Sequence, residues 1–196
     1  ARPEQGYVEY ITSIEDIPLD SGDWLILART NYRLKNLVPQ LKERGLYFEI
    51  KNRKSYRTRL YRSIQDYTRW TNGAKLSLSE CRDLFEFLEL NKELKDERMY
   101  DLKEFGYSFT DDWYQVFKSD PEECLYIREM IRNEEKLSQD PRIKLSTIHA
   151  AKGGEATNVL IILDNTKKIR EAIEKNQDKY DEEQRVWYVG VTRTKQ

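Results

Sequence analysis

The N-terminal part of the chain alternates between short apolar runs and a segment with helical periodicity. The run "DWLILAR" (23–29) is continuously apolar at its centre, which is typical of a parallel strand buried on both faces. Four aliphatic residues then recur at spacings of three and four, namely Leu34, Leu37, Val38 and Leu41. This spacing indicates an amphipathic helix that ends at Gly45, and Pro39 predicts a kink or a shortened first part. The run "LYFEI" (46–50) is the next predicted strand, so the order is strand, helix, strand.

The middle of the chain has helical periodicity throughout. One helix is predicted from about Arg57 to Gly73, and a second is predicted to open at Ser79. Asp120 followed by Pro121 is an N-cap and first-turn signal for a further helix. No strand pattern interrupts these helices, so this part of the sequence predicts an all-helical block.

Strand patterns return near the C-terminus. The runs "IKLSTI" (143–148) and "NVLIILD" (158–164) are predicted strands, and helices are expected at about 166–176 and 181–193. The last helix is expected to begin with a capping box in "DEEQ" (181–184), with acids in its first turn.

Because strands and helices flank the helical block, the sequence predicts an α/β domain interrupted by an all-helical insertion. The first α/β segment has too few strands to close a sheet without the last one. We therefore expect one domain formed by 1–72 together with 141–196, and a helical insertion at 73–140.

Charge changes this picture, since it is unevenly distributed in a chain of 196 residues with net charge −1. Seven basic residues and the single acid Asp66 lie between Lys51 and Arg69. Nine acids and five bases lie between Glu80 and Glu104. A polyanion would be attracted to the first stretch and repelled by the second.

The composition argues against a membrane or secreted protein. The longest aliphatic run, 159–163, is far too short to span a bilayer, and the N-terminus lacks the apolar region of a signal peptide. Cys81 and Cys124 are expected to be reduced, buried thiols rather than a disulfide. We expect a cytoplasmic protein that does not bind membranes.

The only histidine lies in the stretch "LSTIHAAKGGEA" (145–156). A lone histidine after a strand commonly has no role, and a glycine pair is commonly a turn. No second histidine or cysteine is near, which argues against a metal site, and no nucleophile elbow accompanies Ser146. However, the carboxyl end of a strand is where α/β proteins bind ligands. Glu155 is suited to ribose hydroxyls, and Thr147 and His149 to a phosphate backbone.

Three segments together resemble the second motor domain of UvrD/Rep-type superfamily 1 helicases. They are "LILARTNYRLKNLVPQLKERGLYFEI" (25–50), "STIHAAKGGEATNVLII" (146–162) and "DEEQRVWYVGVTRTKQ" (181–196), which match motif IV, the motif V region and motif VI in order. The resemblance implies a RecA-like parallel-sheet domain, and the insertion corresponds in position to the 2B domain of that family. This sequence differs from the family pattern at Gly154, Gln184 and Thr194, where the family commonly has leucine, arginine and alanine, respectively.

The resemblance also implies roles for individual residues. Arg29 and Arg193 would both reach the γ-phosphate of ATP as catalytic residues. Glu155 would bind the ribose beside Gly153, and Tyr188 matches a motif VI tyrosine. Thr147 and His149 would contact single-stranded DNA.

The basic stretch 51–69 is a further candidate for nucleic-acid binding. It follows the motif IV strand directly, and Arg59 and Arg62 can share one side of a helix. That side could hold phosphates, while an exposed Tyr56 or Tyr61 could stack on a base. The alternative is a solvated helix face with its tyrosines in the core.

None of the eight glycines belongs to a G-x-x-x-x-G-K-[ST] sequence, so the chain has no P-loop. We therefore expect half of a motor, with ATP and Mg²⁺ bound mainly by an upstream RecA-like domain and no activity of this fragment alone. The resemblance implies an ATP-dependent DNA helicase that couples hydrolysis at an interdomain cleft to translocation and unwinding at duplex junctions, as in DNA repair and replication. A non-catalytic nucleic-acid-binding module and the motor of a helicase–nuclease remain alternatives. A protein partner is expected at the insertion.

Overall fold

The computed structural model describes residues 7–91, 93–106, 112–151 and 153–195. In this part of the chain, five strands form one sheet in the order β3-β2-β4-β1-β5. All neighbouring strands are parallel except β3, which pairs antiparallel with β2. The strands are β1 (Trp24–Ala28), β2 (Phe48–Ile50), β3 (Arg53–Lys54), β4 (Ile143–Thr147) and β5 (Asn158–Ile162). The predicted α/β fold with a parallel sheet is confirmed.

Strand β1 lies near the middle of the sheet because its side chains are apolar on both faces. It pairs along its whole length with β4 on one side and β5 on the other, so that Ala28 lies beside Thr147 and Ile162. Leu25 and Leu27 face one layer of the core, whereas Ile26 and Ala28 belong to the other. A strand that is buried on both faces needs this continuous apolar run.

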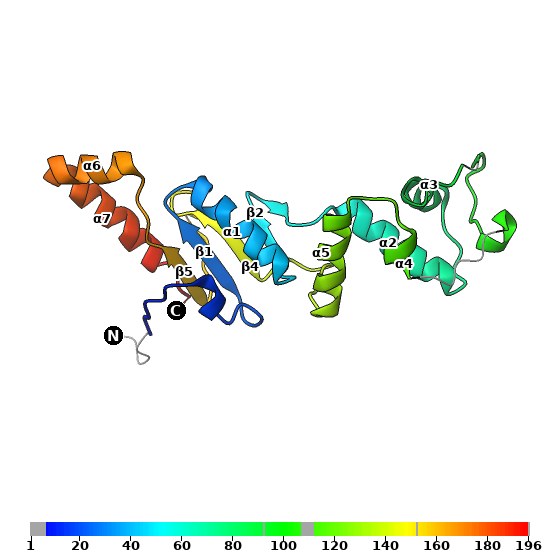
Figure 1. Ribbon diagram of the computed structural model, residues 1–196, viewed down its shortest axis with the longest axis horizontal. Coiled ribbons are helices and arrows are strands. Elements are labelled where there is room, and N and C mark those ends of the chain that lie inside the picture. Colours follow the sequence, from blue (N-terminus) through cyan, green and yellow to red (C-terminus); the bar gives the residue numbers. More distant parts are fainter. Residues whose placement is uncertain (1–6, 92, 107–111, 152, 196) are drawn as a thin grey trace.

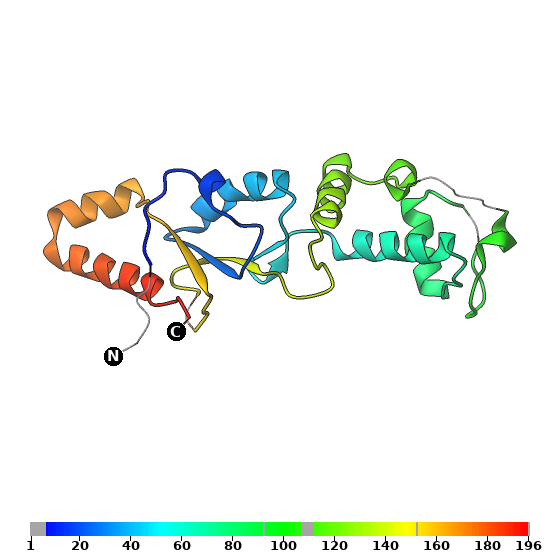
Figure 2. The ribbon, with the colours of Figure 1, turned by 90° about the horizontal axis from the view of Figure 1, so that it is seen from below.

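Two layers of helix cover the sheet. Helix α1 (Asn31–Glu43) packs on β1 and β4 through buried Leu34 and Leu41. Helix α7 (Gln177–Val191) covers the opposite face and packs with Ile148 and Leu27 around a smaller core. Helix α6 (Lys167–Lys175) forms a hairpin with α7 at one end of the elongated molecule (Figures 1 and 2).

The helical part extends from the other end of the sheet (Figure 1). Its helices are α2 (Thr58–Thr71), α3 (Leu78–Phe87), α4 (Trp113–Val116) and α5 (Pro121–Arg132), and a short 3-10 turn lies at Leu102–Phe105. A second 3-10 turn, Ile14–Asp16, precedes β1. Helix α2 packs on α3 and α4. By its packing, α2 therefore lies with the helices that follow it. The expected boundary between the α/β domain and the insertion, at residues 72 and 73, stays a prediction.

Helix α5 joins the helical part to the sheet. The buried Tyr126 hydroxyl donates to the Leu46 carbonyl at 2.6 Å. The Glu123 carboxylate accepts from Lys42 of α1 at 3.0 Å and from the backbone N–H of Arg57, at the start of α2, at 2.8 Å. One apolar core runs from Ile26 in the sheet to Trp70 in the helices, so the two parts share their interior.

Several element boundaries differ from those expected. Helix α1 continues through Pro39 to Glu43, because buried Leu34 and Leu41 hold it on both sides of the proline. Helix α3 is capped by Ser77 in a capping box with Glu80, rather than by Ser79. Helix α7 begins at Gln177 with Asn176 as its cap, so the capping box expected at 181–184 is wrong.

Other local predictions are confirmed. Asp120 caps α5 through Glu122 N–H, and Pro121 occupies its first turn. Cys81 and Cys124 are buried free thiols, and burial raises the pKa of the Cys81 thiol to about 11. Within the described residues, no helix is both long enough and apolar enough to cross a bilayer.

Gly45 gives a test of how tightly α1 and α5 are joined. It has a φ of +62°, and a Cβ there would lie 2.7 Å from Nδ2 of Asn133, whereas Gly73, at φ +87°, has nothing within 4 Å. Both Gly45→Ala and Gly73→Ala strain the backbone, but only the first adds a collision. We expect Gly45→Ala to lower the free energy of unfolding by about 1–3 kcal/mol more than Gly73→Ala, measured by denaturant titration. Equal decreases in the free energy of unfolding in the two variants would show that the contact between α1 and α5 can adjust to the added Cβ.

Candidate nucleic-acid and nucleotide sites

The carboxyl ends of β1 and β4 bring three of the expected site residues together. Arg29 follows β1 directly, Thr147 ends β4, and His149 lies two residues further on. The backbone N–H of Ile148 donates to the Ala28 carbonyl at 3.1 Å, which continues the pairing to the edge of the sheet. Thr147 Oγ1 accepts from the Ala150 N–H at 3.3 Å, so the turn that carries His149 is closed locally.

Arg29 is held at this edge by a carboxylate from α7. Its Nε donates to both Glu183 oxygens, at 2.9 and 3.1 Å, and its Nη1 lies 3.4 Å from Nδ1 of His149. The side chain of Glu183 is 7% exposed and that of Arg29 is 23% exposed. Glu183 was missed by sequence reasoning, which assigned 181–184 to a helix cap. Its spacing from Val186 and Gly190 on the inner side of α7 is the signal that could have identified it.

A cleft of about 430 Å³ opens beside Arg29, between the strand ends and the α6–α7 hairpin. Arg29, His149 and Arg185 line it together with the ion pair of Lys179 and Glu182, whose atoms are 2.7 Å apart. Arg185 is exposed and has no ion-pair partner among the described residues. The cleft therefore offers cationic groups to an anionic ligand at the carboxyl edge of the sheet.

The loop between β4 and β5 crosses from this edge to the opposite one. Gly153 adopts a φ of +86°, a conformation that glycine reaches at little cost. The Gly154 N–H donates to the Ala151 carbonyl at 2.9 Å. Glu155 is exposed, and the next residue, Ala156, is already at the amino end of β5.

Arg193 lies at that amino edge, just after α7. Its carbonyl accepts from the Ala156 N–H at 3.1 Å, and its Nε donates to the Val189 carbonyl at 3.0 Å. The Lys195 N–H donates to the Ala156 carbonyl at 2.7 Å, so the segment after α7 runs beside β5. Anchoring through Nε leaves Nη1 of Arg193 free to meet an anion.

Asp23 fixes this segment to the start of β1. Its carboxylate accepts from Lys195 Nζ at 2.8 Å and from the Thr157 N–H at 3.1 Å. These hydrogen bonds, that of Lys195 first, hold the pKa of Asp23 well below its usual value. The ion pair lies at the surface, so it orders the C-terminal residues rather than supporting the core.

The structure does not bring Arg29 and Arg193 together. Arg29 contacts Glu183, and Arg193 lies ten positions after Glu183, just past the end of α7, which corresponds to a length of about 15 Å. The first side chain lies at the carboxyl edge and the second at the amino edge. The expectation that both arginines reach one γ-phosphate is not supported by this geometry, because tertiary pairing with Glu183 turns Arg29 toward α7 and His149. Arg193, Glu155 and Gly153 lie on the other side.

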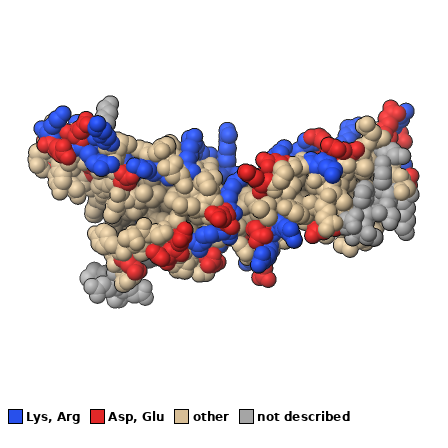
Figure 3. Space-filling model, viewed as in Figure 1, with Lys and Arg blue, Asp and Glu red and all other residues tan. Residues whose placement is uncertain are grey.

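Two of the seven basic residues of the stretch 51–69, Arg59 and Arg69, are paired with acids. Arg59 pairs with Asp83 and with Glu86, at N–O distances of 2.8 and 2.6 Å. Arg62 is exposed and has no ion pair among the described residues. Figure 3 accordingly shows both signs of charge intermingled over the helical part. A nucleic-acid role for Arg59 and Arg62 stays a prediction, and Arg62 offers the freer charge.

The tyrosines of this stretch lie mostly in the core. Tyr56 is 6% exposed and donates its hydroxyl to the Leu137 carbonyl at 2.7 Å, so it cannot stack on a base. Tyr61 is half-buried and packs edge-on against Tyr56, with ring centroids 5.5 Å apart. The exposed Tyr56 allowed by the sequence is therefore wrong, because its hydroxyl has found a backbone partner 81 residues away.

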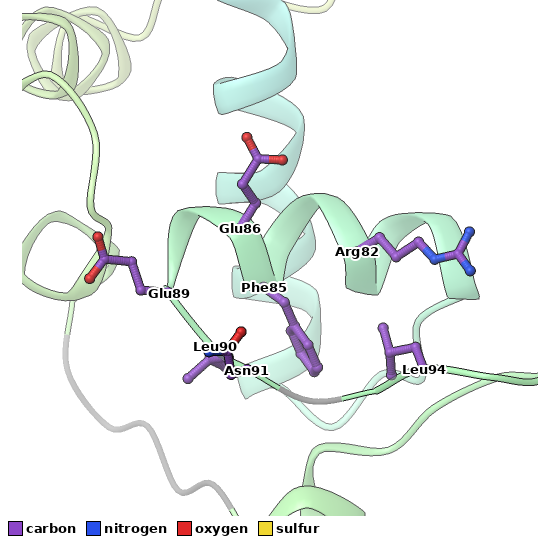
Figure 4. A pocket seen from close by; sticks show the side chains of 7 residues that line it. All are labelled: Arg82, Phe85, Glu86, Glu89, Leu90, Asn91 and Leu94. Carbon is purple, nitrogen blue, oxygen red and sulfur yellow. The ribbon is translucent and has the colours of Figure 1, made fainter.

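The helical part has a cavity of its own, of about 500 Å³ (Figure 4). Phe85, Leu90 and Leu94 form its apolar side. Arg82 and Glu89 stand at its rim, and neither has an ion-pair partner among the described residues. The described residues contain no group of three or more potential metal ligands, here or elsewhere.

The mostly parallel sheet and the helices that cover it define an α/β domain with a charged cleft at the carboxyl edge. The family model of the UvrD-like helicase C-terminal domain matches residues 54–196, and the chain belongs to this family. Neither the curated proteins nor the solved structures gave a match to this chain.

Asp23→Asn tests the attachment of the segment after α7. The folded pKa of Asp23 lies below its ordinary value of 3.8, so the carboxylate stabilises the fold above about pH 4 and loses this effect as the pH falls. We expect faster amide exchange at Lys195 in the variant at pH 7, with the difference from wild type shrinking below about pH 4. Asp20→Asn is the matched control, since the Asp20 side chain is 80% exposed. Unchanged exchange at Lys195 would mean that the backbone bonds to Ala156 suffice.

Proposed function

We propose that this chain is the second motor domain of an ATP-dependent superfamily 1 DNA helicase, which acts with a RecA-like domain that carries the P-loop. The family match makes the helicase class the starting point. The observation that carries the proposal is the separation of two groups of charged residues on opposite edges of one sheet, joined by α7. A motor that couples two ligands needs two such sites on one rigid element.

The carboxyl edge is proposed to contact single-stranded DNA. Arg29 and His149 lie side by side there, and Thr147 ends the adjoining strand. Guanidinium and imidazole groups are suited to phosphate oxygens, and these contacts position a strand without reading its sequence. The neighbouring Arg185 adds an unpaired cation to the same cleft. The helicase would meet duplex junctions with the carboxyl edge of this sheet.

The amino edge is proposed to face the nucleotide, with Arg193 at the γ-phosphate and Glu155 beside Gly153 at the ribose. These residues fit the outer part of an ATP site, because they offer a guanidinium and an exposed carboxylate. The phosphate cradle and the Mg²⁺ site are proposed to belong to the other RecA-like domain, since this sequence contains no P-loop motif. MgATP would supply the phosphoryl group, and Arg193 would neutralise charge that develops on it when the two domains close.

The helical part is proposed to meet a protein rather than the DNA strand. Nine acids lie between Glu80 and Glu104, and its arginines at 59 and 69 are paired with acids. The cavity beside Phe85 adds a mixed surface, in which Leu90 and Leu94 lie beside Phe85 and the charged side chains of Arg82 and Glu89 stand at the rim. Phosphates would be repelled from this acidic surface, whereas an apolar side chain with charged neighbours would fit it.

Arg193→Ala in the full-length protein tests the proposed nucleotide role. We expect ATP turnover to fall by roughly 10³-fold or more, the scale of an arginine that neutralises the transferring phosphoryl group. ATP binding should change much less, because most phosphate contacts belong to the P-loop domain. Steady-state turnover and nucleotide titration give the two readouts, and Arg132→Ala, at an exposed position of α5, is the control. Near wild-type turnover in Arg193→Ala would exclude this residue from the reaction.

A further inference from the structure

Glu183 contacts Arg29 in a way that constrains one part of the guanidinium and leaves the rest available. Both carboxylate oxygens accept from Nε, at 2.9 and 3.1 Å. Nη1 lies beside His149, and Arg29 and His149 both line the cleft at the carboxyl edge. The Nη end of the guanidinium is therefore directed along the edge, where the proposed phosphate contacts lie.

A carboxylate at Nε has two opposing effects on phosphate binding. It fixes the side chain, and so reduces the conformational entropy that Arg29 would lose when a phosphate binds. It also offsets the positive charge, which weakens the attraction of a distant phosphate. The first effect depends on the length of the side chain at position 183, because the carboxylate must extend as far as Nε. The second effect depends on the charge of that side chain.

The geometry favours the first effect. Glu183 is almost fully buried, and both its oxygens are used on a single N–H, whereas an arginine that is only to be neutralised commonly presents two N–H groups to a carboxylate. The nearest acid on α7, Glu182, is exposed and pairs with Lys179 instead. Burial of one acid among exposed ones marks a specific contact rather than a general charge balance.

We infer that Glu183 is a positioning residue for Arg29: held through Nε, the arginine keeps its Nη groups set for a backbone phosphate of single-stranded DNA. This inference rests on the proposed function. The family match reaches residue 183 but assigns it no role, and the residue lies on the helix that ends at Arg193. The orientation of Arg29 therefore follows the position of α7 on the sheet.

Two substitutions at position 183 separate the effect of side-chain length from that of charge. Glu183→Gln keeps the length of the side chain and an oxygen that can accept from Nε, but removes the charge. Glu183→Asp keeps the charge but withdraws the carboxylate by one methylene. Glu174→Gln and Glu174→Asp are the matched controls, at an exposed position of α6 that does not line the cleft. The probe is an oligo-dT strand, titrated into the full-length protein across a salt series.

If Glu183 positions Arg29, Glu183→Asp loses one phosphate contact. Its log–log salt slope should be smaller than that of wild type by about 0.7, with weaker affinity at low salt. Glu183→Gln should keep the wild-type slope and bind at least as tightly. Both substitutions should have no further effect in an Arg29→Gln background, which a general loss of stability would not produce.

Three results would overturn the inference or its basis, and they can be told apart. A wild-type slope in Glu183→Asp, together with a changed slope in Glu183→Gln, would show that charge alone matters. Behaviour of both variants like the Glu174 controls would remove any role for Glu183. Absence of salt-dependent binding by the wild-type protein would instead overturn the proposed function. Thermal unfolding confirms that each variant is folded. If Glu183→Asp is not folded, Glu183→Ala takes its place: it removes the contact to Nε, so its slope should be smaller than that of Glu183→Gln, and equal slopes in the two variants would overturn the inference.

Discussion

The arrangement of both candidate sites depends on strand β1 being buried on both faces. Its apolar run places it between β4 and β5, and the parallel register fixes what lies beyond each of its ends. Arg29 therefore emerges next to the turn that carries His149. Asp23 emerges at the other end and holds Thr157 and Lys195. A shift of one residue in this register would turn the apolar side chains to the wrong faces and move both edges.

Helix α7 connects the two edges that β1 defines. Gly190 lets it lie close to the sheet, since a Cβ there would be 3.2 Å from Cδ1 of Ile161. Nearer its beginning, Glu183 binds Arg29, and just past its end Arg193 joins Ala156. One helix thus contacts the residues proposed for DNA and carries the arginine proposed for ATP. A movement that follows ATP hydrolysis would be transmitted along α7 without any other element being rebuilt.

The sequence predicts the sheet and most helices because their signals are local. A continuous apolar run marks β1, and a helical spacing of apolar residues marks α1. Asp120 with Pro121 marks the start of α5. The site is predicted less well, because its contacts join distant residues. Arg29 and Glu183 are 154 positions apart, and although the spacing of Glu183 from Val186 marks it as facing inward, no local pattern names Arg29 as its partner. The ion pairs of Arg59 could not be predicted for the same reason, since the acids that pair with it lie in another helix.

The central claim is that DNA and nucleotide occupy opposite edges of this sheet. Backbone amide shifts of the isotope-labelled chain, followed by NMR while an oligo-dT strand is added, test it most directly. The account predicts that the shifts gather at Arg29, Thr147 and His149, while Glu155 and Arg193 stay unchanged. Shifts that gather instead at Glu155 and Arg193, or in the helical part alone, would contradict it.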